Sequence, residues 1–137
     1  KILGEKNMAK IAEYIQTADF KAEKHAPTIE IPEVVKASEP FAITVRVGKE
    51  IPHPNTTEHF IGWIMVYFKA KEGKFVHNIG KFEFTSHGES TEGANKGPAY
   101  TSPIATFMVK LEKPGTLVAV SYCNIHGLWE NSVDINF

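Results

Sequence analysis

The chain has 137 residues, of which 42% are hydrophobic and 11% aromatic. This length allows one domain with a substantial core and is too short for two ordinary domains. The 15 Lys and Arg residues nearly balance the 16 Asp and Glu residues, and a net charge of −1 argues against broad binding to nucleic acid or to an anionic membrane. The longest apolar run, 60–68, is far shorter than the roughly 20 residues of a membrane-spanning helix.

The first residues and the cysteine content bear on the compartment. Residues 1–7 contain neither an apolar core nor a small-residue cleavage site, so we predict no signal peptide and expect the protein in the cytoplasm. Cys123 is the single cysteine of the chain, so no internal disulfide can form. This excludes the class of small secreted scaffolds that depend on disulfides for stability.

A short N-terminal extension is predicted to precede the main domain. Apolar residues recur at helical spacing over residues 8–16, with polar residues on the other side. Asn7 is a suitable N-cap for this short helix. We therefore divide the chain into an extension with a short helix at 1–19 and a β-sandwich domain at 20–137.

From residue 25 onward the hydrophobic period falls to two, which is typical of strands with one buried face. Turn residues separate seven predicted strands, at 28–31, 41–47, 60–69, 75–84, 104–111, 117–122 and 133–137. A parallel sheet would need crossover helices, for which the chain has no room. The sequence therefore predicts an all-β fold, a seven-stranded, immunoglobulin-like antiparallel β-sandwich. Its longest loop is expected at 85–103.

The residues most able to carry chemistry are histidines and the lone cysteine. Cys123 and His126 form a Cys-x-x-His pair directly after an apolar strand, where a glycine-containing turn can bring a thiolate and an imidazole onto one centre. His53 and His59 lie on one loop between two strands, and His25 precedes the first strand. Because strand ends and loops of a sandwich can meet, we predict a metal site of four imidazoles and one thiolate.

The other two histidines do not fit this pattern. His77 lies within a predicted strand, and His87 lies in a turn-like stretch. We interpret both as residues that do not bind the metal.

Several metals and functions are compatible with these donors. A structural zinc site is closed and four-coordinate, usually with several cysteines, which five donors with one thiolate do not match. A blue-copper protein transfers electrons without catalysis, but its axial Met should follow the Cys-x-x-His pair, and no Met lies after Met108. Five donors on a metal that prefers six leave one position open, which favours iron that binds a small molecule. A structural or binding sandwich with an inert Cys123 is the third hypothesis.

Three stretches of the sequence are similar to those of a known family. They are Glu23-Lys24-His25-Ala26-Pro27, His53-Pro54-Asn55-Thr56-Thr57-Glu58-His59 and Ser121-Tyr122-Cys123-Asn124-Ile125-His126-Gly127-Leu128-Trp129. In this order they resemble the superoxide reductases of the neelaredoxin type, and the turn at 87–90 is also similar. The resemblance extends from about residue 20 to residue 137. Desulfoferrodoxin relatives carry an additional domain with a four-cysteine iron centre, whose cysteines are absent here, so the chain resembles the single-iron class.

The resemblance implies one mononuclear iron per chain, alternating between Fe2+ and Fe3+, which reduces superoxide to hydrogen peroxide by one electron. His25, His53, His59 and His126 would bind this iron in one plane, with the Cys123 thiolate as the axial ligand and a sixth position open. An external donor, commonly rubredoxin in this family, would re-reduce the iron. Members of the single-iron class are often homotetramers, which we expect here by analogy.

The resemblance also gives roles to the two charged residues before His25. Glu23 would occupy the sixth iron position in the resting ferric state, and Lys24 would offer positive charge to the incoming superoxide. A local positive field accelerates the capture of a scarce anion even when the net charge of the protein is negative. We therefore predict both as catalytic residues, with Glu23 also a metal ligand.

Overall fold

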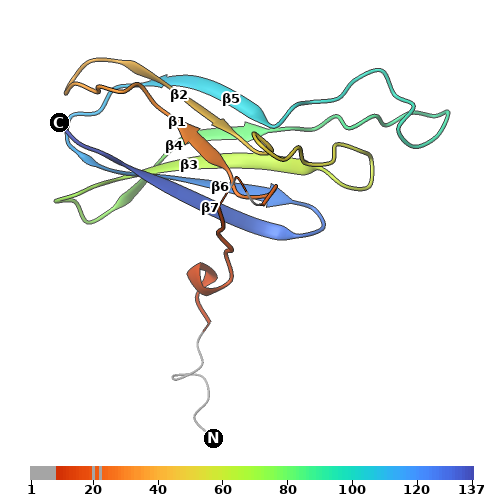
Figure 1. The fold of residues 1–137 in the computed structure, drawn as a ribbon, viewed down its shortest axis with the longest axis horizontal. Coiled ribbons are helices and arrows are strands. Elements are labelled where there is room, and N and C mark those ends of the chain that lie inside the picture. Colours follow the sequence, from red (N-terminus) through yellow and green to blue (C-terminus); the bar gives the residue numbers. More distant parts are fainter. Residues whose placement is uncertain (1–8, 20, 22) are drawn as a thin grey trace, which may run out of the picture.

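The computed structural model describes residues 9–19, 21 and 23–137, and strands make up nearly all of its regular structure (Figure 1). Its elements, in chain order, are a 3-10 turn η1 (Ile11–Glu13) and the strands β1 (Thr28–Glu30), β2 (Phe41–Arg46), β3 (Ile61–Ala70), β4 (Val76–Glu83), β5 (Ile104–Val109), β6 (Gly115–Cys123) and β7 (Gly127–Ile135). Among the described residues, no helix has the length and apolar character needed to cross a membrane.

The strands form two antiparallel sheets that pack face to face. One sheet has the order β1-β2-β5 and the other the order β4-β3-β6-β7. This arrangement confirms the predicted seven-stranded, immunoglobulin-like antiparallel sandwich. The loop between β4 and β5, at 84–103, is the long loop that the sequence predicts.

The core between the sheets follows from the alternation of side chains along each strand. In β6 the inward positions are buried, and they include Leu117, Ala119, Ser121 and Cys123. Cys123 is therefore buried by its place in this alternation, at the end of a central strand. Each aliphatic side chain buried in such a core contributes roughly 1.5–3 kcal/mol to stability.

The predicted helix at 8–16 is wrong, because the described part of this segment forms only the 3-10 turn η1. Gln16 pairs with Trp129 as an isolated parallel bridge, and the Gln16 N–H donates to the Leu128 carbonyl at 3.0 Å. This extended pairing beside β7 ends the turn, and so short a helix has little stability of its own. The expected apolar stripe is largely exposed, since Ile11 has 65% of its surface accessible. Asn7 and Met8 lie outside the described residues.

The last strand begins earlier than its predicted start at residue 133. The β6–β7 hairpin is closed by 124–126, and β7 starts at Gly127, which has a φ of 81°. Glycine adopts this left-handed conformation without steric cost, which permits the tight turn. The polar residues between Glu130 and Ser132 hide the strand pattern in the sequence. As a result, the Cys-x-x-His pair spans a hairpin between two long paired strands.

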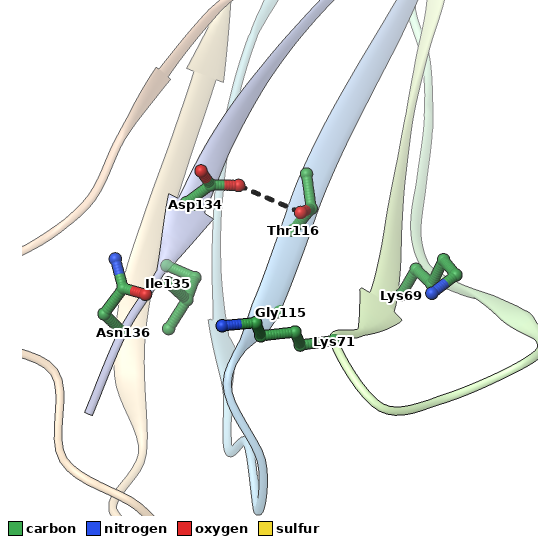
Figure 2. Close-up of a pocket in the computed structure, with 7 residues that line it drawn as sticks. All are labelled: Lys69, Lys71, Gly115, Thr116, Asp134, Ile135 and Asn136. Atoms are coloured by element: carbon green, nitrogen blue, oxygen red, sulfur yellow. Dashed lines mark hydrogen bonds between the residues drawn. The ribbon is translucent and has the colours of Figure 1, made fainter.

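The two ends of the four-stranded sheet differ in what they carry. The loop before β3, the loop 84–103 and the β6–β7 turn extend from one end of the sandwich, and the C-terminus lies at the other (Figure 1). At the C-terminal end, a shallow polar hollow of about 300 Å³ lies over β3, β6 and β7 (Figure 2). Its lining residues are Lys69, Lys71, Gly115, Thr116, Asp134, Ile135 and Asn136.

The outward face of the four-stranded sheet is unusually apolar. It carries a groove of about 680 Å³. Its apolar lining comes from Trp63, Tyr67, Val118, Val120 and Leu128, with Ile11 and Ile15 from the N-terminal segment.

Candidate metal centre

Four side chains from three separate stretches converge at one end of the sandwich. His25, His53, His59 and Cys123 each offer one ligand atom, and these atoms all lie within 4.8 Å of one another. His25 and Cys123 are buried, and the other two are half-buried. A group of soft and borderline donors with this spacing is able to hold a transition metal.

His126 lies directly beside this group. Its Nδ1 is 3.1 Å from Nε2 of His25 and 3.7 Å from Sγ of Cys123. The backbone N–H of His126 also donates to the sulfur at 3.4 Å, as the turn between the two residues requires. All five donors predicted from the sequence therefore meet at one place.

Each histidine of the loop 53–59 presents one nitrogen that has no protein partner. Nδ1 of His53 lies 2.7 Å from the Pro54 carbonyl, so this nitrogen carries the hydrogen and Nε2 keeps its lone pair. Nε2 of His53 and Nε2 of His59 are buried without a hydrogen-bond partner. Buried polar atoms are nearly always satisfied, and two unsatisfied lone pairs aimed at one centre fit a bound metal ion.

Burial also sets the protonation of these two ligands. Desolvation is the main cause that lowers the pKa of His53 from 6.5 to about 4, and the charges of His25, His59 and Lys24 lower it further. Desolvation likewise lowers the pKa of His59, with contributions from His126, His25 and Lys24. Neutral imidazole is the form that binds a metal, so the fold prepares both side chains for ligation.

Asn124 joins two of the three ligand stretches. Its Oδ1 accepts from the Phe60 N–H at 2.9 Å, and its Nδ2 donates to the Glu58 carbonyl at 2.8 Å. These bonds hold the chain on both sides of His59 against the hairpin that carries Cys123. Asn124 was not predicted as a site residue, although its place inside the Cys-x-x-His pair was a usable signal.

Glu23 lies against His25 as an orienting group. One carboxylate oxygen contacts Nδ1 of His25, and the other accepts from the backbone N–H groups of His25 at 2.6 Å and Ala26 at 3.1 Å. Burial raises the pKa of Glu23, but these hydrogen bonds outweigh it and hold the pKa below the usual 4.5. The ionised carboxylate fixes the ring so that Nε2 of His25 faces the centre. A carboxylate is a common hydrogen-bond partner for a metal-binding histidine.

Trp129 is a further neighbour of the cluster and was not predicted from the sequence as a site residue. Its indole stacks on the His25 ring with centroids 4.9 Å apart and planes 15° apart. Its Nε1–H donates to the His126 carbonyl at 3.2 Å. Trp129 therefore contacts two of the five donor residues from the start of β7.

Lys24 and the two other histidines were also considered in the sequence, and only Lys24 lies beside the cluster. Lys24 is half-buried beside the cluster, close enough for its charge to act on His53 and His59. His77 is exposed on β4, and His87 is buried in the loop 84–103 with both ring nitrogens bonded to protein atoms. Neither His77 nor His87 belongs to the donor cluster formed by the described residues.

Comparison with known proteins places the chain among relatives over most of its length. The desulfoferrodoxin family model matches residues 17–132. Neelaredoxin from Megalodesulfovibrio gigas is 55% identical over 123 residues, which cover 90% of this chain and 95% of that protein. Superoxide reductase from Pyrococcus furiosus is 52% identical over 125 residues, or 91% and 98% of the two chains. The structure of superoxide reductase (neelaredoxin) from Archaeoglobus fulgidus in the reduced form has a TM-score of 0.83 at 48% identity, covering 90% of this chain and 98% of that one.

Proposed function

The chain belongs to the desulfoferrodoxin family, and on this basis we propose that it is a superoxide reductase with one mononuclear iron. The observation that carries the proposal is the convergence of His25, His53, His59 and Cys123, with two buried nitrogens left unsatisfied. His126 completes the proposed ligand set as the fourth imidazole. The iron-binding domain would comprise 20–137.

The donor set supports iron over the alternatives from the sequence. Imidazole binds iron, copper and zinc alike. One thiolate and four imidazoles are more ligands than a closed, four-coordinate zinc site holds. Met108 is exposed on β5, at 63%, so it does not complete a copper site. An inert Cys123 would leave the unsatisfied nitrogens of His53 and His59 unexplained.

The proposed reaction takes one superoxide anion, one electron and two protons to one hydrogen peroxide. An iron held by these residues would supply the electron to superoxide, and an external one-electron donor, for which we propose rubredoxin, would restore it. The thiolate of Cys123 adds electron density to the site, as axial thiolates do in other iron proteins. Glu23 holds His25 in place, and we propose that its carboxylate would be a further ligand when the iron is ferric.

Lys24 is the proposed steering residue. Its positive charge contributes to the lowered pKa of both His53 and His59, which places this charge near the space that the donors surround. A positive charge at the mouth of a site raises the rate of encounter with a small anion, and salt weakens the effect. Together with Glu23, Lys24 is a proposed catalytic residue.

Two properties of the assembly and compartment belong to the same proposal. The family resemblance implies a homotetramer, and the apolar groove over β3, β6 and β7 supports contact between copies through this face. We propose the cytoplasm as the compartment, where reducing conditions would keep Cys123 available as a thiolate ligand. Sedimentation of the wild type and of Val118→Glu tests the interface, because a charge in the groove should split the tetramer.

The decisive experiment is rapid mixing of the reduced, iron-loaded protein with superoxide. We expect one superoxide consumed per iron, hydrogen peroxide as the product and no dioxygen. Metal analysis of the same sample should give one iron per chain. Evolution of dioxygen would indicate dismutation and contradict the proposal, as would stoichiometric copper in place of iron.

A further inference from the structure

His87 is one of the most deeply buried polar side chains of the molecule, with 2% of its surface exposed, and the proposed reaction does not use it. It lies in the loop 84–103. Its Nδ1 is 2.7 Å from Oδ1 of Asn55, and its Nε2 is 2.7 Å from the carbonyl oxygen of Phe84. A buried imidazole with two short bonds is held in one orientation.

The neighbours of Asn55 determine which atoms donate. Nδ2 of Asn55 donates to the Thr101 carbonyl at 3.0 Å, so the amide oxygen must be the atom that faces His87. The second partner of the ring, the Phe84 carbonyl, is also an acceptor. Both ring nitrogens of His87 therefore face protein oxygen atoms, and these two contacts fix the orientation of the ring.

The same ring touches the other end of the segment that carries two metal ligands. Phe60 stacks on His87 with ring centroids 3.9 Å apart and planes 11° apart. Asn55 follows His53 by two residues, and Phe60 directly follows His59. One buried imidazole thus contacts the chain near the start of the segment 53–59, by a hydrogen bond, and directly after its end, by stacking.

The loop 84–103 is itself folded firmly around His87. The Thr101 N–H donates to the Ser86 carbonyl at 2.7 Å, and the Gly88 N–H donates to the Ala99 carbonyl at 3.0 Å. Gly88 has a φ of 85°, and a Cβ at this position would overlap the Tyr100 side chain. These contacts give the imidazole a fixed base from which to hold its partners.

A separate tether joins the same two segments. Oδ1 of Asn95 accepts from the Thr57 N–H at 2.7 Å, in the middle of the ligand segment. Asn95 has a φ of 62°, a left-handed conformation that asparagine tolerates better than most residues. The loop 84–103 therefore contacts the segment 53–59 near its start, its middle and its end.

We propose that His87 is a positioning residue for the metal centre, holding the segment with His53 and His59 by its hydrogen bond to Asn55 and by stacking on Phe60. It acts on the metal only through these neighbours. The inference extends the proposed function to the support of the same site, but it requires only that a metal binds there. It thus survives if superoxide is not the substrate.

The test uses metal affinity in place of catalysis. His87→Phe keeps an aromatic ring against Phe60 and removes both polar contacts of the imidazole. Asn55→Ala removes one of these contacts together with the hydrogen bond to the Thr101 carbonyl. We expect Co2+ to bind each variant about 10- to 100-fold more weakly than the wild type, as for the loss of other groups that orient metal ligands. The matched control is His77→Phe, the same substitution at an exposed site on β4, which should bind Co2+ with wild-type affinity.

Spectra separate positioning from general destabilisation. In the Co2+ protein, both variants should keep the absorption band of the Cys123 thiolate and change the ligand-field bands, because only the loop histidines move. Asn55 is half-buried, so Asn55→Ala carries the test if His87→Phe does not fold. Wild-type Co2+ affinity and an unchanged spectrum in Asn55→Ala would overturn the proposal.

The hydrogen bond between His87 and Asn55 can be observed directly by nuclear magnetic resonance. In the Zn2+-loaded wild-type protein, nitrogen–proton spectra should show a hydrogen on Nδ1 of His87 that exchanges slowly with water. This hydrogen should exchange faster in Asn55→Ala, since its acceptor is gone. Equal exchange rates in the two proteins would overturn the role of this hydrogen bond.

Discussion

The two ends of the β3-β6-β7 ladder are built from the same strands, but their polar groups differ in burial and in hydrogen bonding. At the end with the β6–β7 turn, buried donors point at one centre and two nitrogens have no partner. At the other end, the polar groups of the hollow are open to solvent or bonded to one another, as with Thr116 Oγ1 and Asp134 Oδ1 at 2.9 Å (Figure 2). A hollow alone therefore does not mark a site, whereas buried and unsatisfied donors that converge do.

Among the changes at the two ends, removal of the Cys123 thiolate should have the largest effect, a loss of iron affinity. Cys123→Ser keeps the size of the side chain but replaces a soft ligand with a hydroxyl. We expect iron affinity to fall by more than about 100-fold, because loss of an indirect partner already costs roughly 10- to 100-fold. The absorption band of the iron–thiolate pair should vanish, which visible spectroscopy and metal analysis will show. Thr116→Ser at the opposite end is the control, and its iron content should equal that of the wild type.

Acid should destabilise the metal-free protein through the ligand end. Because the pKa of His53 is lowered from 6.5 to about 4, the unfolded chain binds a proton in this window and the folded protein does not. The stabilising contribution is therefore complete above pH 6.5 and is lost as the pH falls toward 4. Urea unfolding across this range should show a steeper pH dependence in the wild type than in His53→Gln. The exposed His77→Gln should retain the wild-type slope, and equal slopes in all three proteins would contradict the assignment.

Charge removal at the two ends should affect superoxide capture unequally. Lys24→Ala should slow the second-order reaction about three- to tenfold at low salt, because the steering charge beside the donors is lost. Lys71→Ala removes the same charge at the far hollow and should leave the rate unchanged. Stopped-flow rates at several salt concentrations will measure both. If the two variants slow capture equally, net charge and not position explains the rate.

The smallest effect is expected from the polar pair in the hollow. Thr116→Val removes the hydrogen bond to Asp134 across neighbouring strands while keeping the shape of the side chain. Such cross-strand pairs contribute about 0.2–1 kcal/mol, so the free energy of unfolding should fall by no more than this. Urea unfolding measures the change, and metal content should be unaltered. A loss of metal would show that the two ends are coupled through the ladder.

Much of the donor set could be predicted because its residues are chemically distinctive and sit at strand ends. Cys123 lies in phase with the buried positions of β6, and Pro54 marks the loop with His53. The supports of the site were not predicted. Asn124 and His87 act through contacts with residues far away in the chain, and local patterns do not encode such partners.

Element boundaries failed where tertiary contacts override local pattern. The segment 8–16 has helical spacing, but Gln16 is held in an extended bridge beside β7, which ends the turn. The early part of β7 is rich in polar residues, yet it pairs with β6 along its whole length because the hairpin at 124–126 sets the register. In both cases the conformation depends on pairing with another strand, and the sequence of the segment alone does not identify that strand.

The burial of the Cys123 thiol depends on the register of β6. Cys123 pairs with Ile61 on one side and with Gly127 on the other, at the last rung of both ladders. Successive residues of a strand point to opposite faces, so sliding β6 by one residue would present Tyr122 to the interior and turn the sulfur toward water. Insertions in the turn between β3 and β4 leave this alignment intact, whereas one extra residue at 124–126 disturbs the spacing between thiol and imidazole. Variation in length should therefore accumulate at the end remote from the donor cluster.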